Sequence, residues 1–185
     1  MSESQPVLPF AGLRPSFKSR IAERVARSRD PIARLRAGPA LELYYEAGDP
    51  HSQLCAALAQ RLLPRLRVPL HIRLVPAPSA ETYPEEARQR AFAALDATRI
   101  APCYGLPAPQ TLTLAQRSAL QAQLAAFAPN DAAGFLAAER RMLDALVAGR
   151  SLPNNADQQA HDPLLAANAA RREKLGHYLP AMWQY

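Results

Sequence analysis

Apolar and polar residues alternate over two short segments of the chain, residues 41–46 and residues 70–75. Such alternation predicts two β-strands, each with one apolar face. Asp49 suits the N-cap of a helix between them, and Pro50 suits its first turn. The apolar face of this helix is predicted from leucines at every fourth position, which are Leu54, Leu58, Leu62 and Leu66. A strand, a helix and a second strand predict a βαβ unit with parallel strands and a right-handed crossover.

The sequence after residue 75 favours helices. Alanine supplies much of the apolar content, and aromatic residues make up only 6% of the chain, which is typical of helices packed through small side chains. Caps and periodic apolar residues predict helices over residues 84–100, 114–127 and 131–149. A last helix is predicted over residues 162–176, with Asp162 as N-cap and Pro163 in its first turn.

Two strands alone are too few for a stable sheet. No third segment after Val75 shows the alternation of the first two. A third strand therefore comes from residues 106–113, from residues 178–185, or from outside this chain.

The first 38 residues carry most of the positive charge. They hold eight arginine or lysine residues against three acidic residues, a net charge of +5, while the whole chain has +6. Apolar residues at every fourth position over residues 16–28 predict a short amphipathic helix. A basic leader can bind phosphates or anionic lipid, but a solvated arm or a helix that docks on a partner explains the charge equally well. We divide the chain into a basic segment, residues 1–39, and a domain, residues 40–185.

Several classes of protein and site are not indicated by the sequence. No apolar run is long enough to span a membrane, and the N-terminus lacks the features of a secretory signal, so we expect a cytoplasmic protein without membrane contact. No recognition motif accompanies the basic leader, so we expect no nucleic-acid partner. The histidines and cysteines lack the spacing of metal ligands, which predicts no metal site. Cys55 and Cys103 lie 48 positions apart, outside any CxxC motif, and we expect both to be buried.

The residues most suited to chemistry are Asp49-Pro50-His51-Ser52, at the start of the first predicted helix. A helix N-terminus has unpaired N–H groups and a partial positive charge, which stabilise a nearby thiolate, carboxylate or phosphate. Open α/β folds bind ligands where a parallel strand ends and the next helix begins. The simpler alternative is that Asp49 and Pro50 only start the helix, while His51 and Ser52 face solvent. A serine hydrolase is disfavoured, because adjacent helical residues point about 100° apart and no GxSxG motif surrounds Ser52.

Residues 41–75, with these four residues at the junction of strand and helix, resemble the first half of the DsbA-like branch of the thioredoxin superfamily. Within that branch the sequence is most similar to 2-hydroxychromene-2-carboxylate isomerases and kappa-class glutathione transferases. The four residues lie where DsbA-type oxidoreductases carry Cys-Pro-His-Cys and where the isomerase and transferase relatives carry Ser-Pro-aromatic-Ser. The resemblance implies a thioredoxin-like α/β fold, with a βαβ unit at residues 40–76 and a large helical insertion at residues 82–176.

The resemblance further implies a site at the helix N-terminus that binds a small thiol or anionic substrate, with glutathione as its cofactor. The implied catalytic residues are Asp49, His51 and Ser52, and the implied ligand-binding residues are Gly48, Pro50 and Gln53. The two cysteines of the oxidoreductases are missing, which excludes dithiol–disulfide exchange at this site. Asp49 departs from both family patterns. Its ionised carboxylate would repel a thiolate, unless Asp49 is protonated or Ser52 acts as the hydrogen-bond donor.

A cis-proline loop and two further strands also belong to the family pattern. We expect them beyond Tyr185 or from a second chain, so that the sheet of this chain is partial. The first functional hypothesis is an isomerase or transferase of the DsbA-like family. The alternative is a non-catalytic, degenerate thioredoxin-like binding or interaction module, in which Asp49 has replaced the reactive group and caps its own helix.

Overall fold

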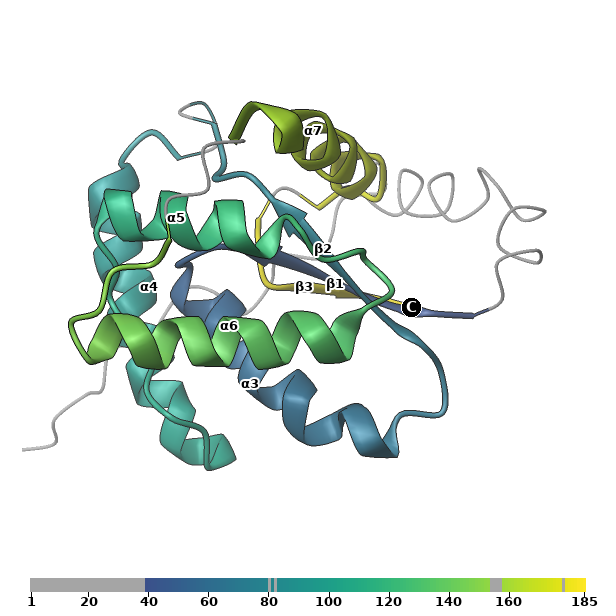
Figure 1. Ribbon diagram of the computed structural model, residues 1–185, viewed down its shortest axis with the longest axis horizontal. Coiled ribbons are helices and arrows are strands. Elements are labelled where there is room, and N and C mark those ends of the chain that lie inside the picture. The colour runs from purple at the N-terminus through teal and green to yellow at the C-terminus, as the bar shows by residue number, and fades with distance from the viewer. Residues whose placement is uncertain (1–38, 80, 82, 154–157, 178) are drawn as a thin grey trace, which may run out of the picture.

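The computed structural model describes residues 39–79, 81, 83–153, 158–177 and 179–185 (Figure 1). These residues form a mixed α/β fold with a small sheet. The predicted helix at residues 16–28 and nearly all of the basic segment lie outside the described residues. None of the helices within the described part of the chain is long and apolar enough to cross a membrane.

The predicted βαβ unit is confirmed. Strand β1 (Leu41–Glu46) pairs in parallel with β2 (Leu70–Val75), and the two are joined by α3 (Pro50–Leu62) and a short 3-10 turn, η1 (Leu63–Arg65). The register places Leu43 beside Ile72 and Tyr45 beside Leu74, so the apolar faces of both strands lie on the same side of the sheet.

A third strand, β3 (Met182–Gln184), pairs with β1 in the antiparallel direction. Within the described residues the strand order is β2-β1-β3, with β1 in the centre. Of the three alternatives for a third strand, the segment at residues 178–185 is therefore the correct one. Residues 106–113 contain no strand, and Gln110 in this segment is held by the side chain of Gln53.

The remaining helices are α4 (Glu86–Ile100) with the 3-10 turn η2 (Ala101–Tyr104), α5 (Leu114–Leu124), α6 (Ala132–Val147) and α7 (Gln158–Lys174). Thr113 and Asp131 cap α5 and α6 through their side chains, as the sequence indicated. The predicted start of α7 is wrong, because the helix begins at Gln158 and contains Pro163. Pro163 is its sixth residue, so the missing N–H removes one bond close to the helix start and the helix continues through it.

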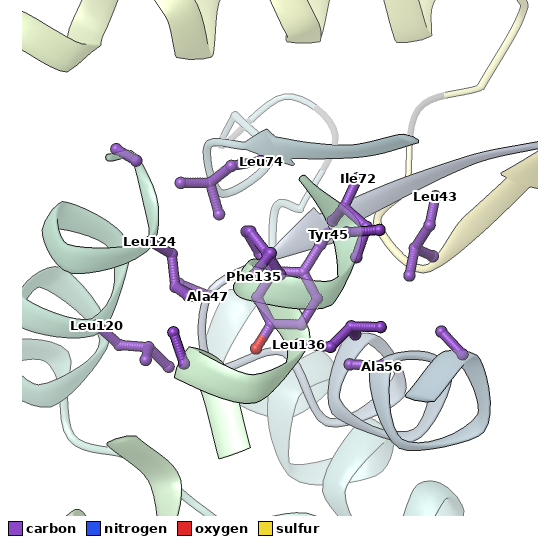
Figure 2. Packing of buried hydrophobic residues seen from close by; sticks show 14 of the residues in the cluster. Leu43, Tyr45, Ala47, Ala56, Ile72, Leu74, Leu120, Leu124, Phe135 and Leu136 are labelled. Carbon is purple, nitrogen blue, oxygen red and sulfur yellow. The ribbon is translucent and has the colours of Figure 1, made fainter. Parts of the chain in front are cut away.

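The two faces of the sheet are covered differently. Figure 1 shows α7 on one side of the strands and α3 and α6 on the other. The main core lies on the side of α3 and α6, where the rings of Tyr45 and Phe135 meet edge to face with centroids 5.3 Å apart (Figure 2). Edge-to-face pairs of this kind add about 1 kcal/mol to the effect of burial.

The face of β1 under α7 is polar and nevertheless buried. Glu42 is 6% exposed and accepts hydrogen bonds from Arg73, Arg171 and the Tyr44 hydroxyl. Burial alone would raise the pKa of Glu42, but these hydrogen bonds and the charge of Arg73 lower it to about 2. The alternation of β1 thus separates an apolar core from a hydrogen-bonded polar layer, and both are shielded from water.

Candidate functional site

A pocket of about 800 Å³ lies between α3 and α4, where β1 stops and α3 begins. Its volume falls within the range of about 300–1,000 Å³ that is usual for sites that bind small organic molecules. The segment Leu179–Ala181, just before β3, closes one side. Most of the lining is apolar, with Leu54, Leu58, Phe92 and Ile100, and the polar lining residues include Asp49, His51 and Tyr83.

Asp49 lines the pocket and also caps α3, as predicted. Its carboxylate accepts a hydrogen bond of 2.7 Å from the backbone N–H of Ser52, and only 5% of the residue is exposed. The glycine before it, Gly48, has φ +79° and packs against the side chain of Arg117. A side chain at Gly48 would collide with Arg117, so a glycine is required at the turn that places Asp49 in the pocket.

His51 also lines the pocket, and its partner comes from α4. The Nε2 atom lies 2.9 Å from Oδ2 of Asp96, and both side chains are partly exposed, by 36% and 40%. Among the described residues, Nδ1 of His51 has no hydrogen-bond partner. The carboxylate of Asp96 orients the ring, and an imidazole held in this way can accept or donate a proton at its free nitrogen.

Ser52 is placed away from the pocket. Its hydroxyl accepts a hydrogen bond of 3.1 Å from the backbone N–H of Glu46, and the residue is completely buried. The simpler alternative of a solvent-facing Ser52 is therefore wrong, because the side chain turns back under the end of β1. In this arrangement Ser52 fixes the junction between strand and helix, and it is not part of the pocket lining that contains Asp49 and His51.

The three residues implied in ligand binding also lie outside the pocket lining. Pro50 is buried in the first turn of α3, and Gly48 contacts Arg117. The amide of Gln53 binds both backbone groups of Gln110, at 2.9 Å and 2.7 Å, and so anchors the loop between η2 and α5. Of the six residues predicted for the site, the pocket brings together Asp49 and His51.

Cys55 is a pocket residue that the sequence did not indicate as functional. Its sulfur accepts a hydrogen bond of 3.3 Å from Nε1 of Trp183, and its thiol donates to the carbonyl of Ala181. Burial raises the pKa of the Cys55 thiol, although the bond from Trp183 opposes this, so the thiol form is favoured. Cys55 therefore ties β3 to α3. The prediction that both cysteines are buried is wrong for Cys103, which is exposed in the turn after α4, whereas Cys55 is partly buried.

Several polar residues at the site were missed by the sequence analysis: Asp96, which holds His51, and Tyr83, Glu85, Arg88 and Gln89 in the pocket lining. Asp96 lies 45 positions after His51 on another helix, and no local pattern links the two. Tyr83 lies in the loop before α4 and lines the pocket near Asp49. Burial raises the pKa of Tyr83, and the negative charges of Asp49 and Glu46 raise it further, so its hydroxyl keeps its proton and can donate a hydrogen bond.

No family model, curated protein or solved structure matches this chain. The DsbA-like assignment therefore stays a prediction from residues 41–75. The geometry of the pocket provides an apolar cavity, an oriented histidine, a carboxylate and a phenol.

Proposed function

We propose that the protein binds a small, mainly apolar organic molecule in this pocket and acts on it as an isomerase or transferase of the DsbA-like family. The observation that carries the proposal is the pocket of about 800 Å³ that opens at the N-terminus of α3, with Asp49 and His51 in its lining. This is the junction at which the resemblance of residues 49–52 expects an active site. Phe92 lines the pocket and is 69% exposed, so part of the apolar lining is open to solvent.

His51 is the proposed acid–base residue. In an isomerisation that shifts a proton from one atom of the substrate to another, a neutral imidazole can accept the proton at one position and return it at the next. Asp96 acts as the positioning residue, because it holds Nε2 and leaves Nδ1 for the substrate. The assay is turnover of 2-hydroxychromene-2-carboxylate by the wild type and by His51→Ala. General acid–base catalysis contributes about 10²–10⁴-fold, so we expect kcat to fall by that range. An equal rate for the two proteins contradicts the role of His51.

Binding is tested apart from chemistry with the fluorescent probe N-phenyl-1-naphthylamine, which is apolar and uncharged. Ala93 on α4 lines the pocket, whereas Ala91 on the same helix is exposed and does not. We expect the Ala93→Trp side chain to fill the cavity and to lower the affinity for the probe by about tenfold or more, equivalent to about 1.4 kcal/mol. Ala91→Trp is the matched control and leaves the affinity unchanged. If both variants bind the probe equally well, the probe binds outside this pocket, and the proposed binding site is contradicted.

Glutathione is the proposed cofactor of this activity. The carboxylate of Asp49 lies in the pocket and repels a thiolate, so glutathione binds here in its thiol form. Isothermal titration at millimolar glutathione tests this. If no heat of binding is measured, glutathione is not the cofactor, and the proposal is reduced to an isomerase without a cofactor.

A second candidate function is the non-catalytic binding module. It is favoured by the hydrogen bonds of Asp49 and Ser52, which are both engaged within the fold. In that case the naphthylamine probe binds, the wild type shows no turnover, and His51→Ala leaves binding of the probe unchanged.

A further inference from the structure

The loop between η2 and α5, residues 105–113, forms part of the wall of two cavities. Leu106 lines the ligand pocket, whereas Pro107 and Pro109 line a separate cleft of about 30 Å³. The rest of the cleft lining comes from α3 and α6. Because Leu106 and Pro107 are adjacent in the chain, a movement of the η2–α5 loop at the cleft also moves the wall of the pocket.

One side chain holds the middle of the η2–α5 loop. Oε1 of Gln53 accepts a hydrogen bond of 2.7 Å from the backbone N–H of Gln110, and Nε2 of Gln53 donates one of 2.9 Å to the carbonyl of the same residue. Within the described residues, no other hydrogen bond ties residues 107–111 to another part of the fold. The loop therefore keeps its place through the amide of Gln53, while Leu106 and Leu112 pack into the fold near its two ends.

Glu139 faces the same cleft with a carboxyl group that is only half satisfied. The residue is 4% exposed, and Oε1 accepts a hydrogen bond of 3.0 Å from the Tyr45 hydroxyl. Oε2 has no hydrogen-bond partner among the residues that the structure describes. A cavity needs about 10–15 Å³ to hold one water, so a cleft of about 30 Å³ has room for one or two.

The charges around Glu139 come from β1 and from α6 itself. The charged or titratable groups that act on Glu139, or on the phenol beside it, are Tyr45, Glu46, Asp49, Arg140 and Asp144. The cleft residues of α3 and of the η2–α5 loop are all uncharged. Burial raises the pKa of Glu139 to about 7, although the bond from Tyr45 and the charge of Arg140 oppose the shift. Glu139 therefore gains or loses its proton near neutral pH.

Ionisation of Glu139 changes what the cleft has to supply. A carboxylate only accepts hydrogen bonds, and its two oxygens have room for about four. The cleft offers two kinds of donor, which are the side-chain amides of α3 and water that enters past Pro107 and Pro109. A bond to a charged acceptor is about twice as strong as a bond to a neutral one. An ionised Glu139 therefore competes with the carbonyl of Gln110 for the amide of Gln53, and water in the cleft pushes the loop outward.

We propose that the η2–α5 loop is a pH-sensitive gate of the ligand pocket, which Gln53 holds in place while Glu139 is protonated and which is released when Glu139 ionises. The inference rests on the proposed function, because it describes how access to the same pocket is regulated. When the gate is released, Leu106 leaves the lining, and an apolar ligand loses part of the surface on which it packs. By linkage, a bound ligand in turn favours the protonated form of Glu139.

The test measures the affinity for N-phenyl-1-naphthylamine at pH 5.5 and at pH 8.5. The probe is uncharged at both values, so a change in affinity comes from the protein. Glu139→Gln keeps an acceptor for Tyr45 and cannot ionise, while Gln53→Leu keeps most of the side-chain volume and loses both bonds to Gln110. His51→Ala is the control, because His51 lines the pocket and histidines in general change their charge in this pH range.

We expect the wild type to bind the probe about fivefold or more weakly at pH 8.5 than at pH 5.5, since couplings between two sites are typically of about this size or larger. Glu139→Gln should bind equally well at both pH values, with the affinity of the wild type at pH 5.5. Gln53→Leu should bind weakly at both, and if this variant does not fold, Glu139→Gln decides the question alone. His51→Ala should keep the pH ratio of the wild type, whatever its absolute affinity.

The backbone amides of Leu106 and Gln110 report on the gate without a ligand. In a two-dimensional ¹H–¹⁵N spectrum, both signals should shift with a midpoint at about pH 7 in the wild type and stay in place in Glu139→Gln.

Three results of the binding assay would overturn the inference. If Glu139→Gln keeps the pH ratio of the wild type, another group sets it. If the wild type binds equally well at both pH values, ionised Glu139 does not open the pocket. If Gln53→Leu binds like the wild type at both pH values, Gln53 does not hold the gate. If the wild type binds the probe at neither pH, the proposed function fails, and amide signals that do not move with pH would then refute the gate as well.

Discussion

Glu139 on α6 is a buried acid whose ionisation should set much of the pH dependence of stability. It is 4% exposed and accepts a hydrogen bond of 3.0 Å from the Tyr45 hydroxyl. Burial raises the pKa of Glu139 from 4.5 to about 7, although the bond from Tyr45 and the charge of Arg140 oppose the shift, and Asp144 adds to it. The folded protein therefore holds this proton more tightly than the unfolded chain does.

The sign follows from linkage between protonation and folding. The stabilisation is fully present below the unfolded-state pKa and is lost as the pH rises from 4.5 to about 7, where the folded protein must ionise a buried carboxyl. Since one pKa unit corresponds to about 1.4 kcal/mol, the full shift is worth about 3 kcal/mol. Glu139→Gln keeps the shape and the acceptor for Tyr45 but cannot ionise. Relative to the wild type, it should gain about 3 kcal/mol between pH 4.5 and pH 8.

The assay is urea unfolding followed by circular dichroism at both pH values, with Glu81→Gln as the control because Glu81 is exposed. The control should follow the wild type at each pH. If the free-energy difference between Glu139→Gln and the wild type changes by less than about 0.5 kcal/mol across this range, Glu139 is not the buried acid described here.

Three further predictions concern the strand and the cap that build the site. Because the pKa of Glu42 is lowered to about 2, its stabilisation is present above pH 4.5 and is lost as the pH falls towards 2; acid titration monitored by circular dichroism should show a shallower loss for Glu42→Gln. Asp49→Ala removes the N-cap bond to α3 and should lower the free energy of unfolding by about 1 kcal/mol in urea. Gly48→Ala should cost about 2 kcal/mol or more by the same measurement, because an L side chain is strained at φ +79° and meets Arg117; a loss below that of Asp49→Ala would mean that the turn adapts.

The elements that the sequence predicted correctly are those with local causes. Residues 41–46 and 70–75 alternate, and Asp49 and Pro50 mark the helix start, so the βαβ unit follows from contacts over a few residues. Strand β3 has only three residues and pairs with a strand about 140 positions earlier. So short a segment carries too little periodicity to indicate a strand before its partner is known.

In the candidate site, too, the features with local causes could be predicted, and those that depend on tertiary packing could not. That Asp49 caps α3 could be predicted because its acceptor and donor lie three residues apart. The partner of His51 could not, because Asp96 is brought to it by the packing of α4 against α3. The role of Ser52 could not be predicted either. Its hydroxyl accepts a hydrogen bond from the backbone N–H of Glu46 in β1, and no sequence pattern links these two residues.

The polar face of β1 shows how tertiary packing adds to a correct local prediction. Glu42 and Glu46 alternate with apolar residues, which is the usual signature of a solvent-facing side of a strand. In the fold both are buried and paired with arginines that come from other elements, Arg73 and Arg90. Such pairs depend on where β2 and α4 dock, so they follow only from the three-dimensional arrangement.

The central claim is that the pocket at the start of α3 binds an apolar small molecule beside His51. The most direct test is a two-dimensional ¹H–¹⁵N spectrum of the protein titrated with N-phenyl-1-naphthylamine. The account predicts that the shifted amide signals gather at His51 and Cys55 on α3, at Phe92 on α4 and at Ala181 before β3. Shifts that gather on α6, or a spectrum that does not change at saturating probe, would contradict it.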